Sequence, residues 1–156
     1  MTTKKHSGQR LAPMDTTALD KVLGYRIRRV KNLMYEDFTR HLHDFGISPV
    51  DFSALGLIAD NPGRPQGEIA AALGVTRANF ATAIKSLDER GLTFREGVHR
   101  DRRLSRIYLT ENGKQFVRAA RKQQGELEAE YARRLGGEEE RDLLLKMLAR
   151  LYTNRD

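Results

Sequence analysis

Residues 67–92 read GEIAAALGVTRANFATAIKSLDERGL and contain two short helical patterns separated by a tight break. The first pattern runs from Gln66 to Leu73, and Gly74 interrupts it. The second begins after Thr76, a good N-cap residue, and Gly91 stops it. The residues expected to face inward are Ile69, Ala70, Leu73, Phe80, Ala83, Ile84 and Leu87. Two short helices joined by a turn that contains glycine predict a helix-turn-helix, whose second helix typically lies in a DNA major groove.

A basic stretch follows the second helix and separates two short strand patterns. Leu92–Phe94 predicts one strand, and Leu104–Leu109 predicts a second strand that returns beside it. Between them lie Arg100, Arg102 and Arg103. Two strands around a basic tip predict a β-wing with its positive charge at the tip.

A long helical pattern precedes this segment. From Thr17 to Gly46, apolar residues recur every three or four positions, which predicts one helix ended by a left-handed glycine. Ser48 and Pro49 then form an N-cap and a first helical position for another helix. Asn61–Gly63 predicts the turn that leads into the helix-turn-helix.

Two more helical patterns follow the wing. Thr110 is expected to cap a long helix that ends near Leu135, and Gly136 and Gly137 break the pattern. The last helix is expected over residues 138–152. The predicted fold class is therefore mainly α with a small β-wing.

The composition restricts the class of protein. The chain has 156 residues, of which 39% are hydrophobic and 31% charged, as expected for a small globular protein with much charged surface. Its 28 Lys and Arg exceed its 21 Asp and Glu, and the net charge of +7 favours a polyanionic partner such as nucleic acid or an anionic membrane. The absence of cysteine excludes disulfides and thiol catalysis. No apolar run approaches the ~20 residues of a membrane-spanning helix. The polar N-terminal arm, residues 1–16, lacks the apolar stretch of a signal peptide, so we expect a cytoplasmic protein.

Motifs typical of enzymes and metal sites are missing from the sequence. There is no glycine-rich phosphate loop and no nucleophile elbow. His41 and His43 are two positions apart and point in different directions on a helix, and no cysteine could complete a zinc site. We therefore expect a protein that is not an enzyme and has no metal and no cofactor.

The order of these elements resembles the MarR family of winged helix-turn-helix regulators. The resemblance covers roughly residues 17–152. It rests on residues 67–92, on DRRLSRIYLTENG at 101–113, and on the long terminal helices. It implies a winged helix-turn-helix lobe over residues 48–110 and dimerisation helices over 17–46 and 111–152. A homodimer is also expected because a chain of this size has too little mass to cover three long amphipathic helices. Its two recognition helices would meet successive major grooves of a pseudo-palindromic double-stranded operator.

The outward face of the second helix supplies candidate DNA contacts. Arg77 can pair with guanine and Asn79 with adenine. Thr82 and Lys85 are more suited to phosphate contacts, although the family often has arginine where this chain has Thr82. The DNA-contact set also includes Thr76 and Gln66, the latter through its side chain or backbone N–H at the start of the first helix. The alternative is an ordinary solvated helix face.

The wing supplies a second set of candidate contacts. Arg100, Arg102 and Arg103 form its tip, and the family pattern assigns Arg103 to the minor groove, which attracts arginine where it is narrow. Asp101 would repel phosphate, so it is interpreted as a brace that orients an arginine. The alternative is a plain solvated loop.

The first long helix mixes cations with aromatic residues, which suits an anionic aromatic ligand. The candidate effector residues are Arg26, Arg29, Tyr35, Phe38 and His41, together with Phe52 of the next helix. The sequences LGYRIRR and TRAN resemble a subgroup associated with degradation of aromatic compounds, which implies a small aromatic acid or its CoA thioester as effector. Dimer packing with solvated arginines is the alternative.

These observations favour a homodimeric transcriptional regulator, most simply a repressor released from its operator by the effector. Two other functions remain open. One is a nucleic-acid-binding protein without sequence preference, and the other is a dimeric adaptor whose helices bind a protein partner.

We expect Arg103→Ala to weaken operator binding. The slope of log affinity against log salt concentration should also fall in magnitude by about one for each phosphate interaction that the substitution removes. Mobility-shift titrations at several salt concentrations measure both quantities. If affinity and slope both stay unchanged, the wing does not touch DNA.

Overall fold

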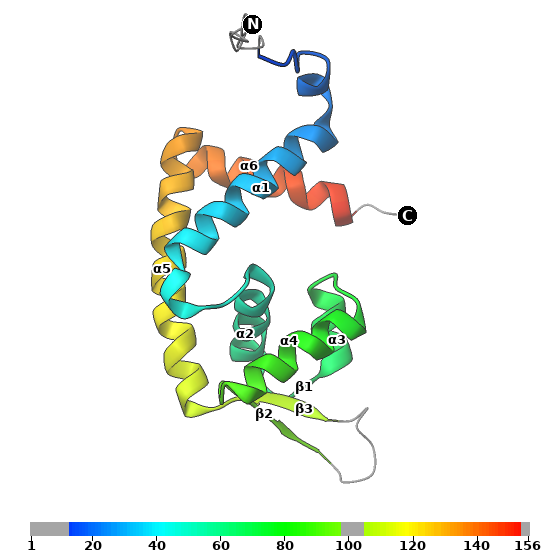
Figure 1. Cartoon of the computed structure of the whole chain (residues 1–156), viewed down its shortest axis with the longest axis vertical. Coiled ribbons are helices and arrows are strands. Elements are labelled where there is room, and N and C mark those ends of the chain that lie inside the picture. Colours follow the sequence, from blue (N-terminus) through cyan, green and yellow to red (C-terminus); the bar gives the residue numbers. More distant parts are fainter. Residues whose placement is uncertain (1–12, 98–104, 154–156) are drawn as a thin grey trace, which may run out of the picture. The chain divides into compact units, whose positions relative to one another are not determined.

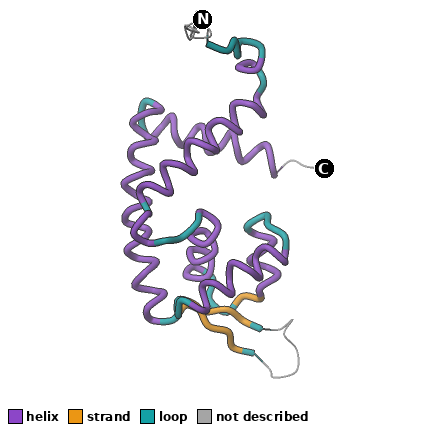
Figure 2. The backbone as a smooth tube through the Cα atoms, in the orientation of Figure 1, coloured by secondary structure: helices purple, strands orange, loops and turns teal. Residues whose placement is uncertain are grey.

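The computed structural model describes residues 13–97 and 105–153 as a chain of helices with one small sheet (Figures 1 and 2). The helical elements, in order, are η1 (Leu19–Lys21), α1 (Leu23–His41), η2 (His43–Phe45), α2 (Pro49–Asp60), α3 (Gln66–Ala72), α4 (Arg77–Glu89), α5 (Glu111–Leu135) and α6 (Glu138–Thr153). The strands are β1 (Arg64–Pro65), β2 (Thr93–Glu96) and β3 (Arg106–Leu109). The predicted fold class, mainly α with a small β-wing, is confirmed. The chain divides into two compact units, with the boundary between Met34 and Tyr35, inside α1.

The single helix predicted from Thr17 to Gly46 is wrong at both ends. Near its start, Val22 has an extended backbone, with φ −94° and ψ 115°, and separates η1 from α1. Near its end, Leu42 leaves helical geometry, with φ −104° and ψ 21°, and η2 follows as a short 3₁₀ turn. The second break has a tertiary cause, because Leu42 is buried in a cluster with Ala120 and Leu127 of α5. The left-handed glycine is confirmed, since Gly46 has φ 56°.

A guanidinium fastens this irregular segment to the end of α4. Arg90 donates hydrogen bonds to the carbonyl oxygens of Phe45, at 2.7 Å, and Gly46, at 2.9 Å. Its guanidinium also lies 5.4 Å from the centroid of the Phe116 ring. The ring of Phe45 meets the same Phe116 edge-on, with centroids 5.3 Å apart.

The helix-turn-helix encloses the main core of the C-terminal unit. Ser48 caps α2 as predicted, and Asp51 completes a capping box with it. The Pro62 turn then leads to α3 and α4. The buried cluster draws on α2, α3, α4, the sheet and α5, and its members include Leu55, Ile58, Ile69, Phe80, Ile84, Leu87, Ile107 and Val117. Ala83, predicted to face inward, is half-buried.

The sheet has three antiparallel strands in the order β1-β3-β2. Strands β2 and β3 are the predicted wing strands, in a register that pairs Thr93 with Leu109 and Glu96 with Arg106. The third strand, β1, pairs Arg64 with Ile107 and was not predicted, because two residues ending in proline carry no strand pattern. Leu92, predicted to open the first strand, lies just before β2 instead. Leu104 and the wing tip lie outside the described residues.

The backbone of Leu92 joins α4, the sheet and α5. Its N–H donates to the Leu87 carbonyl at 3.0 Å, and its own carbonyl accepts from the Thr110 N–H at 3.1 Å. Thr110 caps α5 as predicted, accepting a hydrogen bond from the Gly113 N–H at 2.9 Å. Gly113 lies so close that a Cβ there would be 2.0 Å from the Leu92 carbonyl oxygen.

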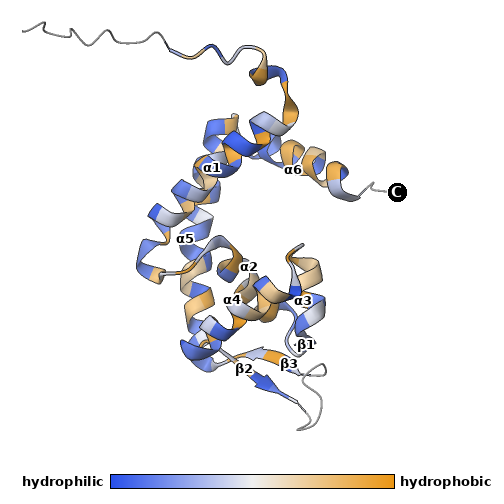
Figure 3. Cartoon of the chain, turned by 45° about the vertical axis from the view of Figure 1, so that its right-hand side comes forward, coloured by the Kyte–Doolittle hydropathy of each residue, from blue (hydrophilic) through white to orange (hydrophobic). Residues whose placement is uncertain are grey.

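The last helix, α6, has several exposed apolar side chains. None of its residues is buried. Leu143, for example, is 56% exposed, and Met147 and Leu151 on the same helix face are also exposed. Figure 3 shows hydrophobic colour along this helix. Across residues 13–97 and 105–153, no helix combines the length and the apolar character needed to cross a membrane.

We expect Gly113→Ala to lower the free energy of unfolding by about 1–3 kcal/mol, since the new methyl group would overlap a backbone carbonyl. Gly125→Ala, in the same helix, is the matched control. Nothing lies within 4 Å of a Cβ at Gly125, so this change should raise stability by up to about 1 kcal/mol. Urea unfolding at one protein concentration compares the three proteins. A Gly113→Ala variant as stable as the wild type would contradict the close contact.

Candidate nucleic-acid interface

The exposed face of α4 begins at a well-formed helix cap. The Thr76 hydroxyl accepts a hydrogen bond from the Asn79 N–H at 3.2 Å. This bond satisfies one of the N–H groups that the first turn of a helix leaves unpaired. Thr76, predicted as a DNA contact, therefore also has a structural role.

The four predicted contacts on α4 are all exposed. They are Arg77, Asn79, Thr82 and Lys85. Thr82 donates its hydroxyl hydrogen to the Ala78 carbonyl at 3.3 Å, and Lys85 forms an exposed ion pair with Glu89 at 3.6 Å. Such surface pairs are weak, so Lys85 is readily available to a phosphate.

Arg77 of α4 and Gln66 of α3 both lie near the first turn of α3. A Cβ on Gly67 would lie 3.8–4.0 Å from Arg77 guanidinium atoms, so Arg77 extends over the first turn of α3. Gln66 begins α3, and its side-chain oxygen accepts a hydrogen bond from Arg95 of β2 at 3.5 Å. Its backbone N–H belongs to the first turn of α3, where a helix offers no carbonyl partner of its own.

A second polar contact set, which the sequence interpretation missed, connects α4 to β2. The Asp88 carboxylate accepts hydrogen bonds from the Thr93 hydroxyl and from the Arg95 Nε, the latter at 2.9 Å. Arg106 of β3 donates to the Gly63 carbonyl at 3.3 Å. No local sequence pattern predicts these hydrogen bonds, because the partner of each side chain depends on where the strands begin.

The predicted wing-tip residues lie outside the described residues. They are Arg100, Asp101, Arg102 and Arg103, and their proposed roles stay predictions. The strands on either side of them, β2 and β3, are paired up to Glu96 and Arg106.

The candidate effector residues divide between the two units. Arg26 and Arg29 belong to the N-terminal unit, where Arg26 donates to the Asp20 carbonyl at 2.8 Å and Arg29 to the Tyr25 hydroxyl at 3.1 Å. The C-terminal unit contains Tyr35, Phe38, His41 and Phe52.

In the C-terminal unit, two of the aromatic candidates, Phe38 and Phe52, pack in an apolar cluster. Phe38 is 6% exposed, and its ring meets the Phe52 ring edge-on with centroids 5.7 Å apart. Tyr35, by contrast, is exposed. His41 is half-buried and hydrogen-bonds the Asp37 carbonyl at 2.9 Å.

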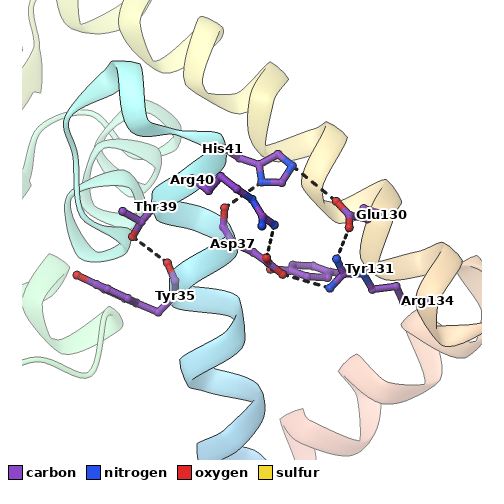
Figure 4. A network of polar contacts seen from close by, with 8 residues as sticks. All are labelled: Tyr35, Asp37, Thr39, Arg40, His41, Glu130, Tyr131 and Arg134. Atoms are coloured by element: carbon purple, nitrogen blue, oxygen red, sulfur yellow. Dashed lines mark hydrogen bonds and ion pairs between the residues drawn. The ribbon is translucent and has the colours of Figure 1, made fainter.

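A buried carboxylate, not predicted from the sequence, organises this region (Figure 4). Asp37 pairs with Arg40 on α1 and with Arg134 on α5, the latter at 3.2 Å. The Tyr131 hydroxyl donates to the same carboxylate at 3.5 Å. Burial, together with the negative charge of Asp37, raises the pKa of Tyr131 to about 12, so this phenol is neutral at physiological pH.

A second polar contact lies beside this carboxylate. The His41 Nε2 lies 3.6 Å from the carboxylate of Glu130 on α5. The end of α1 is thus fastened to α5 by charges as well as by apolar contacts. In the described part of the chain, no three His, Cys, Asp or Glu side chains are grouped as metal ligands would be.

Comparison with known proteins identifies the family. The family model described as "MarR family" matches residues 45–104. The transcriptional repressor CouR, solved bound to a 23-mer DNA duplex, is 34% identical, with a TM-score of 0.82 over 90% of this chain and 99% of that chain. The chain belongs to the MarR family. It is therefore a transcriptional regulator of the MarR type, as the sequence resemblance implied.

Other relatives have similar descriptions. CouR bound to p-coumaroyl-CoA is 33% identical, with a TM-score of 0.81 over 91% of this chain and 99% of that chain. A putative transcriptional regulatory protein for the hcr operon of Thauera aromatica is 29% identical over 154 residues, which cover 96% of this chain and 92% of that protein. These MarR-type relatives are described as regulators of transcription and not as enzymes.

We expect Thr76→Ala to lower the free energy of unfolding by about 1 kcal/mol, because the first turn of α4 loses its cap. Thr76→Ser keeps the hydroxyl oxygen and should be close to wild type. Urea unfolding measures both variants. If the alanine and serine variants have the same free energy of unfolding, the Thr76 hydroxyl does not stabilise α4 as a cap.

Proposed function

We propose that this MarR-family regulator is a homodimeric repressor that binds a pseudo-palindromic operator and is released by a small aromatic acid or its CoA thioester. The observation that carries the proposal is the exposed polar face of α4. It presents a guanidinium, an amide, a hydroxyl and an ammonium group from a capped second helix. These are the donors that pair with base edges and phosphates in a major groove. The DNA-bound form of the related repressor CouR supports the same use of this fold.

We propose that each member of this surface has a distinct role. Arg77 and Asn79 read bases, whereas Thr82, Lys85 and Gln66 contact phosphates. Thr76 holds the start of α4 in place and presents its backbone to the DNA. In the wing, Arg103 would enter the neighbouring minor groove. Arg100 and Arg102 would add DNA contacts at the tip, and Asp101 would orient an arginine.

The uncovered apolar residues support dimerisation through the terminal helices, residues 17–46 and 111–152. In α6, Leu143, Met147 and Leu151 share one face at helical spacing and are exposed. In the N-terminal unit, Leu23, Ile27 and Val30 of α1 are exposed in the same way. A second copy of the chain would remove these side chains from water, and a two-fold axis would pair two recognition helices with two half-sites.

The effector proposal rests on the acyl-CoA-bound form of CouR and on the mixed aromatic and cationic character of α1. We propose Arg26, Arg29, Tyr35, Phe38, His41 and Phe52 as the effector region. Because Phe38 is buried against Phe52, an aromatic ligand can touch both rings only if the pair separates. Such a ligand would release DNA only by binding the DNA-incompetent arrangement more tightly.

A mobility-shift titration with a palindrome taken from near the gene tests the proposal. We expect a Kd of about 10⁻⁸ M or tighter, with steep weakening by salt. We further expect Leu143→Glu to give a monomer by analytical ultracentrifugation and to weaken operator binding about 100-fold, because the second half-site is lost.

Lys146→Glu is the matched control, since Lys146 is already a charged, exposed side chain of the same helix. It should remain dimeric. Equal affinity for the palindrome and for random DNA would instead indicate binding without sequence preference. Dimers that bind no DNA at all would indicate an adaptor for a protein partner.

A further inference from the structure

A cleft of about 670 Å³ lies between the end of α2, the sheet and the first turns of α5. The side chains that line it include Pro62, Phe94, Tyr108, Lys114, Arg118 and Arg121. Among the described residues, none of the lining side chains belongs to α1 or α4. The cleft therefore shares no residue with the recognition face of α4 or with the proposed effector region. Its volume is within the range of small-molecule sites, about 300–1,000 Å³.

One wall of the cleft is formed by a stacked aromatic pair. The rings of Phe94 on β2 and Tyr108 on β3 are stacked, with centroids 5.4 Å apart and planes inclined by 19°. Phe94 is 45% exposed, which leaves much of an apolar ring in water. A planar aromatic molecule lying against this wall would remove that surface from water in a favourable stacked geometry.

The backbone holds the Tyr108 ring in its position in this wall. A Cβ on Gly63 would lie 2.7 Å from the Tyr108 hydroxyl oxygen, so the phenol packs directly on the main chain of the Pro62 turn. Gly63 itself has φ 78°, a conformation that side-chain-bearing residues rarely adopt. The wall is thus preformed, which lowers the entropic cost of binding a rigid ring.

The rim of the cleft is cationic. Lys114, Arg118 and Arg121 are spaced by four and three residues and so occupy one side of α5. Glu111 is the one carboxylate among the described lining residues. Lys114 pairs with Glu111 at 3.3 Å, and Arg121 pairs with Asp60 at 2.6 Å.

Arg118 differs from its two neighbours. It makes no side-chain hydrogen bond or ion pair with any residue in 13–97 or 105–153. Its guanidinium can therefore donate two parallel hydrogen bonds to an incoming carboxylate without first breaking a contact to the described protein.

We propose that this cleft is a ligand site for a small planar aromatic carboxylate, separate from the effector region on α1. The aromatic ring lies against Phe94 and Tyr108, and the carboxylate binds Arg118. Because β2 and β3 flank residues 98–104 in the chain, the bound ligand contacts both strands of the wing. The site does not depend on which operator the regulator recognises.

Titration of the full chain with 2-naphthoate, followed by ¹H–¹⁵N NMR, tests the proposal. Saturable shifts are expected for the amides of β2, β3 and the first turns of α5. Arg118→Gln should weaken binding about tenfold, since a charge-assisted hydrogen bond is lost. Lys122→Gln removes an equal charge from the same helix outside the cleft and should bind like the wild type.

The neutral probe 2-naphthamide separates the carboxylate from the ring. It should bind the wild type more weakly than naphthoate and should bind Arg118→Gln and wild type alike. Unchanged naphthoate affinity in Arg118→Gln, equal binding of acid and amide, or no saturable shift at the cleft would overturn the proposal. Mobility shifts with Arg118→Gln keep the two hypotheses apart. Intact operator binding together with lost naphthoate binding supports the cleft site. Failure of the wild type to bind an operator would count against the proposed function alone.

Discussion

Leu92 uses both of its backbone hydrogen-bonding groups to hold three elements in one arrangement. Its N–H ends α4 by donating to Leu87, and its carbonyl accepts from Thr110 at the start of α5. Between these bonds, β2 and β3 are brought into register from Thr93 and Leu109 onward. Gly113 lets α5 approach this carbonyl closely, because any side chain there would overlap it. The recognition helix, the wing and the long helix of this MarR-family regulator therefore share one junction.

Local signals in the sequence predicted the parts of the fold that depend on neighbouring residues. Ser48, Thr76 and Thr110 were expected as N-caps, and each accepts the expected backbone hydrogen bond. The helical pattern from Thr17 to Gly46 was misleading, because the periodicity continues through Val22 and Leu42 although the backbone does not. The break at Leu42 follows from its burial against α5, which is remote in the sequence. Strand β1 was missed for the same reason, since its pairing with Ile107 is long-range.

The candidate site was predictable to a similar extent. The exposed face of α4 follows from the helical spacing of its buried residues, so Arg77, Asn79, Thr82 and Lys85 could be placed on it from the sequence. The ion pair between Asp37 and Arg134 could not, because the two residues are 97 positions apart. Net charge also says little about which cations are available to DNA. Arg90, Arg95, Arg106 and Arg121 all bind protein carbonyls or carboxylates, and those arginines act as fold-stabilising groups.

The double hydrogen bond from Arg90 has a mechanical consequence for this chain. It joins the C-terminal end of α4 to the two carbonyls that follow α1, and the Phe116 ring packs beneath the guanidinium. The hydrogen bonds therefore connect the segment that follows α1 to the C-terminal end of the recognition helix. A displacement of this segment would break the two hydrogen bonds unless the end of α4 moved with it. Lysine has a single ammonium group and cannot span both carbonyls in a fixed plane, so the connection acts as a rigid two-point linkage only with arginine.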